Sequence, residues 1–194
     1  MALSEMRLQA TYAEADPFSV TPDPLLAKVS PFGRVPVLQQ GEFTLTETSA
    51  ILRYLDQISG APSLVPKDAR AAAQMAQVIG IIDFYGYVPL IRDVFAHGYY
   101  YASVGATPDP EKLERGLTAS EPVLRALEVI AQEGRVLQAT AFSLADIHLA
   151  PMVDYFVKVP VAKALLDEKP ALSAWWKTVK RRPSLVATDP AVHQ

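Results

Sequence analysis

The hydrophobic pattern of this chain changes from a period of two residues to a period of 3.6 near Thr46. Before that point, Val35 to Gln39 is a short apolar run introduced by Pro36, which is typical of a strand that begins at a proline. Residues 40–42 give a turn signal around a glycine, and Phe43 to Leu45 gives a return strand. The sequence therefore predicts a β-hairpin.

A helix is predicted directly after the hairpin. Its apolar residues recur at i, i+4 and i+7 on one face: Ile51, Leu55 and Ile58. Thr46 is the predicted N-cap, and Glu47 lies in the first turn, where a negative charge suits the helix dipole.

The start of this helix is the predicted binding site. A helix N-terminus carries unpaired N–H groups and a partial positive charge, so it can hold a carboxylate. Thr48 adds a hydroxyl and Glu47 adds an acceptor for an ammonium group, and together they fit a zwitterionic amino-acid head group. Val35 can offer its backbone N–H and C=O to an extended peptide if no neighbouring strand uses them. The alternative is a plain capped helix on a hairpin, which is a common structure.

Several stretches carry a family resemblance. Gly33 to Leu38 (GRVPVL) and Leu45 to Leu55 (LTETSAILRYL) resemble the glutathione-binding stretch of the glutathione S-transferase family, in its cytosolic, bacterial type. Phe142 to Ile147 and Pro170 to Trp176 resemble the start of the core helix and the closing helix of the family's helical domain. The resemblance implies a thioredoxin-like α/β domain followed by an all-helical domain.

The resemblance also implies roles for individual residues. The Val35–Pro36 bond is expected to be cis, and Val35 is expected to pair with the cysteinyl backbone of glutathione. Glu47 and Thr48 are expected to hold the γ-glutamyl head group, since Thr48 keeps the hydroxyl of the family's serine. Arg34 keeps the positive charge of the lysine that is common at its position.

The predicted fold class is α/β plus all-α. Residues 1–58 form the thioredoxin-like glutathione-binding domain, which is incomplete. Residues 59–66 form a linker by their serine, glycine and proline content. Residues 67–194 form the all-helical domain.

The helical domain opens with a long amphipathic helix. Its apolar face comprises Ala71, Ala72, Met75, Val78, Ile79 and Ile82. Pro89 is expected to kink or break this helix, and residues 98–107, with three consecutive tyrosines, are expected to form a loop. A second helix is predicted from the Asp109-Pro110 start to Gly134.

The core helix of this domain begins with a capping signal. Ser143 and Asp146 have capping-box spacing, with aspartate in place of glutamate, and Phe142 and Ile147 can form a hydrophobic staple. These residues are interpreted as a folding element with no role in binding. The family usually has a glycine at the position of Ala139, so the preceding loop is expected to be strained or rerouted.

The first residues depart from the family. Met1 to Met6 has helical character without a cap, and Gln9 to Ala13 is predicted to be a short strand. The family's first strand and its thiol-activating Tyr, Ser or Cys are expected to be missing, so no catalytic residue is assigned. Gln9–Ala13 and the Val35 strand are then expected to lie about 10 Å apart, across an empty slot. We expect the 194-residue chain not to catalyse conjugation, whereas a full-length form would.

The acceptor site is less well specified. Tyr85, Arg92 and His97 lie on the first long helix, in the region that faces the hydrophobic substrate in the family. Tyr87 and Tyr99 to Tyr101 are nearby. Tyrosine and histidine could orient an electrophile there, and Arg92 could hold an anionic one. The alternative is packing in a core or an interface, where amphipathic aromatic residues are common.

Composition excludes several classes of function. The chain has no cysteine, which excludes disulfides, thiolate metal sites and a cysteine nucleophile within it. Its net charge of −3 argues against nucleic acid or an anionic membrane as a partner. The three histidines lack partners at ligand spacing, so no metal site is expected. We find no membrane span or signal peptide, and we expect a cytoplasmic location.

Two functions remain open. The first is an enzyme that uses glutathione as co-substrate and conjugates it to a small hydrophobic electrophile, with no other cofactor. The second is a non-catalytic binding or interaction module of the same fold. A homodimer is expected in either case, because the family forms two-fold dimers and the Ala71–Ile82 face looks too long for one small domain to bury.

Overall fold

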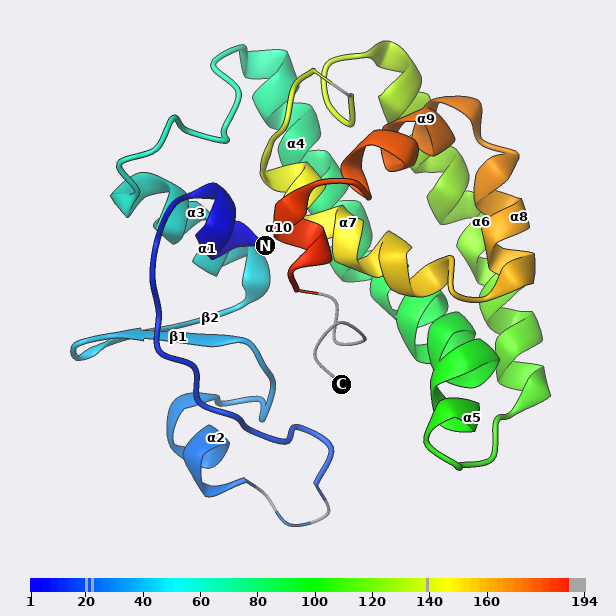
Figure 1. The fold of residues 1–194 in the computed structure, drawn as a ribbon, viewed down its shortest axis with the longest axis horizontal. Helices are drawn as coiled ribbons and strands as arrows, with labels where there is room; N and C mark the ends of the chain where they lie inside the picture. The colour runs from blue at the N-terminus through cyan, green and yellow to red at the C-terminus, as the bar shows by residue number, and fades with distance from the viewer. Residues whose placement is uncertain (20, 22, 139, 189–194) are drawn as a thin grey trace. The chain divides into compact units, whose positions relative to one another are not determined.

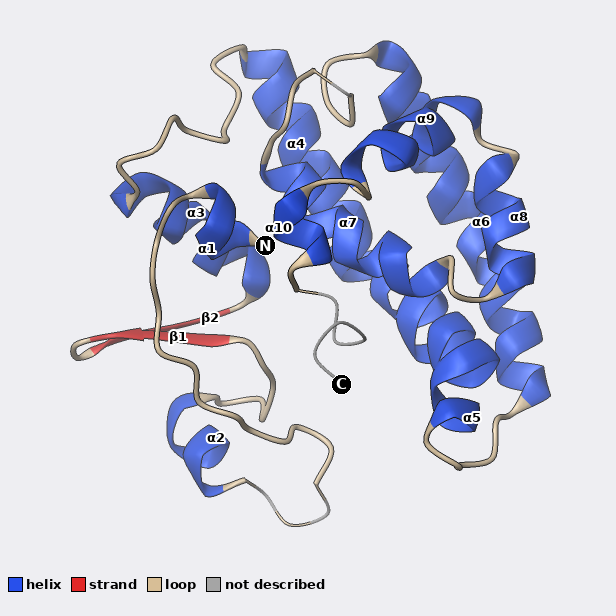
Figure 2. Cartoon of the chain, in the orientation of Figure 1, coloured by secondary structure: helices blue, strands red, loops and turns tan. Residues whose placement is uncertain are grey.

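The computed structural model describes residues 1–19, 21, 23–138 and 140–188, and the chain forms two compact units (Figure 1). One unit comprises Ala2–Ser63, and the other comprises Met1 and the chain from Leu64 onward. The division falls inside residues 59–66, the predicted linker. The first unit is mixed α/β and the second is helical, which confirms the predicted fold class (Figure 2).

The first unit combines short helices with one hairpin. Its elements are α1 (Ala2–Glu5), α2 (Pro24–Val29), β1 (Val37–Gln40), β2 (Phe43–Thr46) and α3 (Thr48–Ile58). The predicted hairpin is confirmed: β1 and β2 pair antiparallel, with Val37 opposite Thr46 and Gln40 opposite Phe43. The two-residue loop places Gly41 at φ 60°, a conformation that costs glycine little.

The apolar face of α3 forms the core of this unit. Ile51 and Leu55 are buried, as the i, i+4 pattern predicts, and Leu52 is buried beside them. Ile58, predicted on the same face, is 43% exposed, because it is the last residue of α3. Met6, which follows α1, and Leu26 of α2 are buried in the same unit. The small core therefore holds the hairpin and the start of α3 in place.

The strand predicted at Gln9–Ala13 is wrong. These five residues are irregular and exposed, and they pair with no strand in the described part of the chain, where the sheet consists of β1 and β2. A strand is stabilised by hydrogen bonds to a neighbour and by side chains packed on one face. This segment has neither, so the expected pair of strands across an empty slot does not form.

The second unit is built from helices of very different length. They are α4 (Ala69–Ile81), η1 (Ile82–Gly86), η2 (Val88–Tyr100), α5 (Tyr101–Ser103), α6 (Pro110–Glu133), α7 (Leu144–Phe156), α8 (Pro160–Asp167), α9 (Pro170–Val179) and α10 (Pro183–Val186). The ends of α6 are as predicted. The Asp109 carboxylate accepts the N–H groups of Glu111 and Lys112, and Gly134 ends the helix in a left-handed conformation, at φ 71°.

The break predicted at Pro89 is also wrong. The chain stays helical from Ala69 to Ser103, with the wider π-helical form in η1 and η2. Pro89 lies inside this continuous helix, where it cannot donate to a carbonyl of the preceding turn, and the wider π-helical form accommodates its ring. The expected loop at residues 98–107 is correspondingly shorter, since Tyr99, Tyr100 and Tyr101 are helical.

The long apolar face of α4 and η1 is covered within the chain itself. The residues of this face that are no more than 8% exposed are Ala71, Met75, Val78, Ile79 and Ile82. The expectation that a partner subunit is needed to bury this face is therefore wrong. The reason is packing of α4 against both α6 and α7.

A buried carboxylate connects α7 to α9. Ser143 is the N-cap of α7, and Asp146 Oδ2 accepts both the backbone N–H and the hydroxyl of Ser143 at 2.8 Å. Asp146 Oδ1 accepts from Trp175 Nε1 at 2.6 Å. Burial raises the pKa of Asp146, while the bonds from Trp175 and Ser143 oppose this increase.

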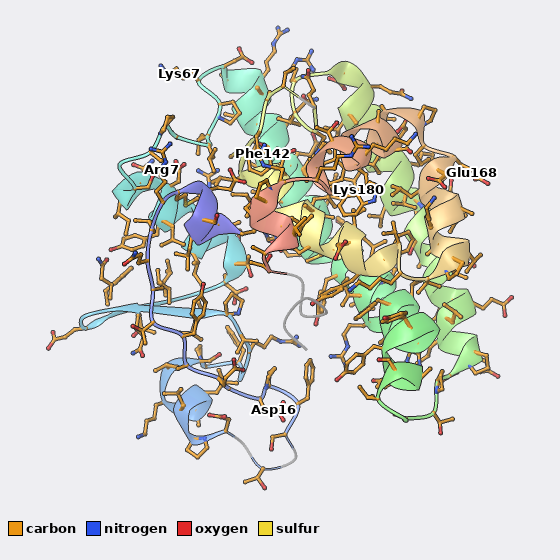
Figure 3. All side chains as sticks on the ribbon, viewed as in Figure 1. Arg7, Asp16, Lys67, Phe142, Glu168 and Lys180 are labelled. Atoms are coloured by element: carbon orange, nitrogen blue, oxygen red, sulfur yellow. The ribbon has the colours of Figure 1, made fainter. Side chains whose placement is uncertain are left out.

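Phe142, the residue before this N-cap, packs against a cationic side chain. Ala139, expected to strain the preceding loop, lies outside the described residues. The guanidinium carbon of Arg182 lies 3.7 Å from the ring centroid of Phe142, a residue labelled in Figure 3. The staple between Phe142 and Ile147 stays a prediction.

A second buried carboxylate caps α9 from α6. Glu128 is 6% exposed, and its two oxygens accept the N–H groups of Ala171 at 3.1 Å and Leu172 at 2.8 Å. The side chain of Gln132 donates to the same carboxylate at 2.7 Å. The bonds from Ala171 and Leu172 satisfy N–H groups of the first turn of α9 that have no partner within the helix.

We predict that Glu128→Gln lowers the free energy of unfolding by about 1–3 kcal/mol, because the amide replaces one acceptor oxygen with an N–H₂ group facing backbone donors. Urea denaturation measures this. The matched control is Glu121→Gln, on the same helix, where a 41% exposed side chain pairs with Lys169 at 3.1 Å. An exposed pair contributes about 0–1 kcal/mol, so equal losses in the two variants would contradict the capping role.

Candidate functional site

The loop before β1 leaves a residue with free backbone groups. The Val35–Pro36 peptide bond is cis, as the resemblance implies, and Val35 is exposed. The β1–β2 ladder begins only at Val37. Among the described residues, neither the N–H nor the C=O of Val35 has a hydrogen-bond partner. Val35 can therefore accept and donate hydrogen bonds along an extended peptide.

The start of α3 differs from the prediction in one respect. Thr46 is not the N-cap, because it is the last residue of β2 and pairs with Val37. Glu47 is the N-cap, at φ 67° and ψ 119°, and its side chain makes no capping hydrogen bond. A non-glycine residue held at positive φ costs about 1–3 kcal/mol, and such residues cluster at functional sites.

The first turn of α3 presents donors to a ligand. The helix hydrogen bonds begin with the N–H of Ile51, which donates to the C=O of Glu47 at 3.0 Å. The N–H groups of Thr48, Ser49 and Ala50 are the unpaired donors of the first turn. The exposed Glu47 carboxylate stands beside them. This N-terminus suits a ligand group that carries both a carboxylate and an ammonium.

The register of the hairpin brings the two halves of the site together. Val37 lies opposite Thr46, so Val35 and Pro36 precede the ladder at the end where Glu47 and Thr48 follow it. Opposed Cα atoms in an antiparallel pair lie about 4.5–5.5 Å apart. The predicted residues of both motifs therefore share one end of the hairpin.

Arg34 completes this end of the unit. Its side chain is exposed, and its backbone is held by the side chain of Ser30, whose Oγ is 2.9 Å from both Arg34 N and Arg34 O. Sequence reasoning gave Ser30 no role. The local sequence is Ser-Pro-Phe-Gly (residues 30–33), and its proline and glycine predict a turn without assigning a role to the serine.

The predicted acceptor residues are spread along η1 and η2. Tyr85 and Arg92 are exposed, and their role stays a prediction. His97 is buried; its Nδ1 accepts the backbone N–H of Asp109 at 2.9 Å, and its ring packs on Tyr101 with centroids 4.8 Å apart. These contacts favour the packing interpretation for His97, because its ring joins η2 to the N-cap of α6.

Tyrosines near His97 also lie in packed groups. Tyr99 stacks on Phe95 with centroids 5.8 Å apart, and Phe95 stacks on Tyr155 at 4.5 Å. Tyr87 is half-buried and Tyr100 is exposed. Sequence reasoning also missed the pair of buried His148 and exposed Asp83, whose Nε2 and Oδ1 atoms lie 2.7 Å apart. No sequence signal joins residues so far apart.

The described ranges contain neither a metal cluster nor a membrane-spanning helix. No group of three or more His, Cys, Asp or Glu residues placed to hold a metal ion occurs among them. None of the described helices combines the length and the apolar character needed to cross a bilayer.

Comparisons with known proteins agree with the geometry. Residues 1–63 match the glutathione S-transferase N-terminal domain, and residues 91–183 match the C-terminal domain of the same family. Glutathione S-transferase F9 from Arabidopsis thaliana is 30% identical over 168 residues, which cover 83% of this chain and 75% of the relative.

Solved structures extend the similarity. A glutathione S-transferase III in apo form superposes with a TM-score of 0.82 at 26% identity, over 97% of this chain and 89% of that one. A glutathione S-transferase from Rhodospirillum rubrum superposes with a TM-score of 0.72 at 25% identity, over 95% of this chain and 82% of that one. Plant and bacterial proteins both occur among these relatives, so the narrower bacterial type stays a prediction.

The environment of His97 gives a prediction of pH dependence. Burial, and then the nearby Lys112, lower the pKa of His97 below its usual 6.5. Below pH 6.5 the unfolded chain therefore binds a proton that the folded chain does not, and stability falls as pH falls towards the lowered pKa. His97→Gln removes this contribution.

Urea denaturation of both proteins between pH 5 and 8 measures the effect. We expect His97→Gln to be the less stable protein near pH 8, and the difference to shrink as the pH is lowered. A difference that stays constant or widens on acidification would contradict a neutral, bonded His97.

Proposed function

Because this chain belongs to the glutathione S-transferase family, we propose that it binds glutathione at the open end of the β1–β2 hairpin and conjugates it to a small hydrophobic electrophile. This proposal replaces the expectation from the sequence that the 194-residue chain does not catalyse conjugation. The observation that supports this most is the free backbone pair of Val35 beside the uncapped start of α3. One peptide strand and one amino-acid head group fit these two features together.

Each part of glutathione has a matching group in this proposal. Val35 N–H donates to the cysteinyl C=O, and Val35 C=O accepts the cysteinyl N–H. The γ-glutamyl carboxylate accepts from the N–H groups of Thr48 and Ser49 and from the Thr48 hydroxyl, while Glu47 pairs with its ammonium. Arg34 supplies a positive charge for the second carboxylate of the tripeptide.

The transfer step is a nucleophilic attack by the glutathione sulfur. A free thiol titrates near pH 8.5, so a donor that stabilises the thiolate raises the reactive fraction at neutral pH. The thiol releases its proton to solvent, and the thiolate sulfur forms a bond to the electrophilic carbon. With an aryl halide, the halide leaves with the bonding pair of the carbon–halogen bond. No residue of this chain is assigned to thiolate stabilisation, and the conjugation assay described below measures turnover directly.

Several finer proposals accompany this function. Tyr85 and Arg92 are proposed to contact the electrophile from η1 and η2. The protein is proposed to be cytoplasmic and to act in detoxification, with glutathione as co-substrate, and its negative net charge favours neither nucleic acid nor a membrane as partner.

A homodimer is also proposed, on a different basis from the sequence argument. Three large side chains on η1 and η2 are far more exposed than is usual for their type: Phe84 at 83%, Tyr85 at 69% and Val88 at 57%. Phe84 and Val88 are four residues apart on the helix and are therefore neighbours on its surface. The ring centroids of Phe84 and Tyr85 lie 6.5 Å apart, so the three side chains form one exposed cluster. An exposed apolar cluster of this kind marks an interaction surface.

Replacing Thr48 tests the site. Thr48→Val removes the hydroxyl and keeps the volume, so glutathione binding is expected to weaken by about 1–3 kcal/mol, the cost of leaving a charged partner short of a hydrogen bond. Thr48→Ser keeps the hydroxyl and is expected to bind as the unaltered protein does. Calorimetry gives the affinity, and conjugation of an aryl halide gives turnover.

The matched control is Thr44→Val. Thr44 is an exposed residue of β2, and its hydroxyl accepts a hydrogen bond from the Gln39 side chain at 3.3 Å. It is expected to change neither affinity nor rate. Equal affinity in Thr48→Val and the unaltered protein would remove Thr48 from the site. Binding without turnover would favour the non-catalytic module over the enzyme.

The dimer is tested by light scattering at micromolar concentration. We expect the mass of two chains for the unaltered protein and a shift towards the mass of one chain for Phe84→Ser. Serine cannot replace the apolar contact that an aromatic anchor makes at an interface. Phe18→Ser, at an exposed aromatic residue of the first unit, is the control. A monomer in the unaltered protein would contradict the proposal.

A further inference from the structure

One buried hydroxyl closes the loop that precedes Val35. Ser30 is the C-cap of α2, and its N–H donates to the C=O of Leu26 at 2.9 Å. The residue is 7% exposed. Its hydroxyl donates to the C=O of Arg34 and accepts the N–H of the same residue, both at 2.9 Å. One side chain thus holds both backbone groups of a residue four positions away.

The rest of the loop is closed by a single backbone bond. The N–H of Gly33 donates to the C=O of Ser30 at 3.2 Å, and Gly33 takes φ 59° with open space around it. A loop closed by so few bonds depends on each of them, and the Ser30 hydroxyl makes two. Removing it leaves the backbone of Arg34 without a hydrogen bond to Ser30, and the bond from Gly33 alone then holds the loop to the α2 end.

Peptide geometry passes this constraint on to Val35. The Arg34–Val35 bond is trans, since the cis bond in this region is the one between Val35 and Pro36. The C=O of Arg34 and the N–H of Val35 therefore belong to one rigid plane and point in opposite directions. Fixing the C=O of Arg34 against Ser30 fixes the direction in which the free N–H of Val35 points.

We infer that Ser30 is a positioning residue for glutathione: it makes no contact with the ligand, and it aims the Val35 N–H at the cysteinyl carbonyl. This inference rests on the proposed function. Its energetic basis is pre-organisation, because a donor already held in its bound direction loses less freedom on binding.

Calorimetry with matched variants tests the inference. We expect Ser30→Ala to weaken glutathione binding about 5- to 10-fold, the value of one hydrogen bond to a correctly aimed donor. Ser30→Thr keeps the hydroxyl and restores the affinity. The control is Ser59→Ala, since Ser59 is the C-cap of α3 and its hydroxyl also bonds a backbone C=O, that of Asp56 at 3.1 Å. We expect that variant to bind within about twofold of the unaltered protein.

A second ligand separates positioning from general loss of stability. In a glutathione analogue whose cysteinyl carbonyl is replaced by a methylene, the Val35 N–H has no acceptor. We expect Ser30→Ala and the unaltered protein to bind this analogue equally. A purely structural role would weaken both ligands alike, and that result would overturn the inference. If Ser30→Ala does not fold, Ser30→Cys replaces it, since sulfur has a similar size and bonds weakly.

Glutathione binding by the unaltered protein separates failure of the site from failure of the Ser30 role. Absence of glutathione binding by the unaltered protein would overturn the proposed function and this inference together. Binding by the unaltered protein, with equal affinity in Ser30→Ala and Ser59→Ala, would overturn the role of Ser30 alone.

Discussion

The pairing of Val37 with Thr46 is the interaction on which the candidate site depends. It ends the hairpin ladder so that Val35 remains unpaired on one strand, while the chain leaves the other strand directly into α3. The turn into that helix forces Glu47 to positive φ and leaves its side chain free of a capping bond. A register shift of one residue would move every side chain of the hairpin to the opposite face and separate the two motifs.

The helical unit relies on buried carboxylates that accept from helix ends and side chains. Asp146 bonds Ser143 and Trp175, and Glu128 bonds the first turn of α9. Buried acidic groups are costly unless they are fully bonded. Here each carboxylate oxygen finds a donor, and that requirement fixes how α6, α7 and α9 meet.

Local signals predicted much of the fold from sequence. The hairpin follows from its turn glycine, and both ends of α6 follow from Asp109 and Gly134. The failures have a common physical cause in tertiary context. Gln9–Ala13 has strand-like residues without a partner, and Pro89 is accommodated by a π-helical turn. For the site, Val35, Glu47 and Thr48 were predicted from the start of the helix and from the family motif, but neither the backbone of Glu47 nor the bonds of Ser30 has a signal in the sequence.

An amide NMR titration of the ¹⁵N-labelled protein with glutathione tests the proposed binding site directly. We expect the amide signals of Val35, Thr48 and Ser49 to shift together and to saturate at one affinity, since these three N–H groups are the proposed donors. Saturable binding that leaves all three signals in place, or that shifts only residues of the helical unit, would contradict the proposed site.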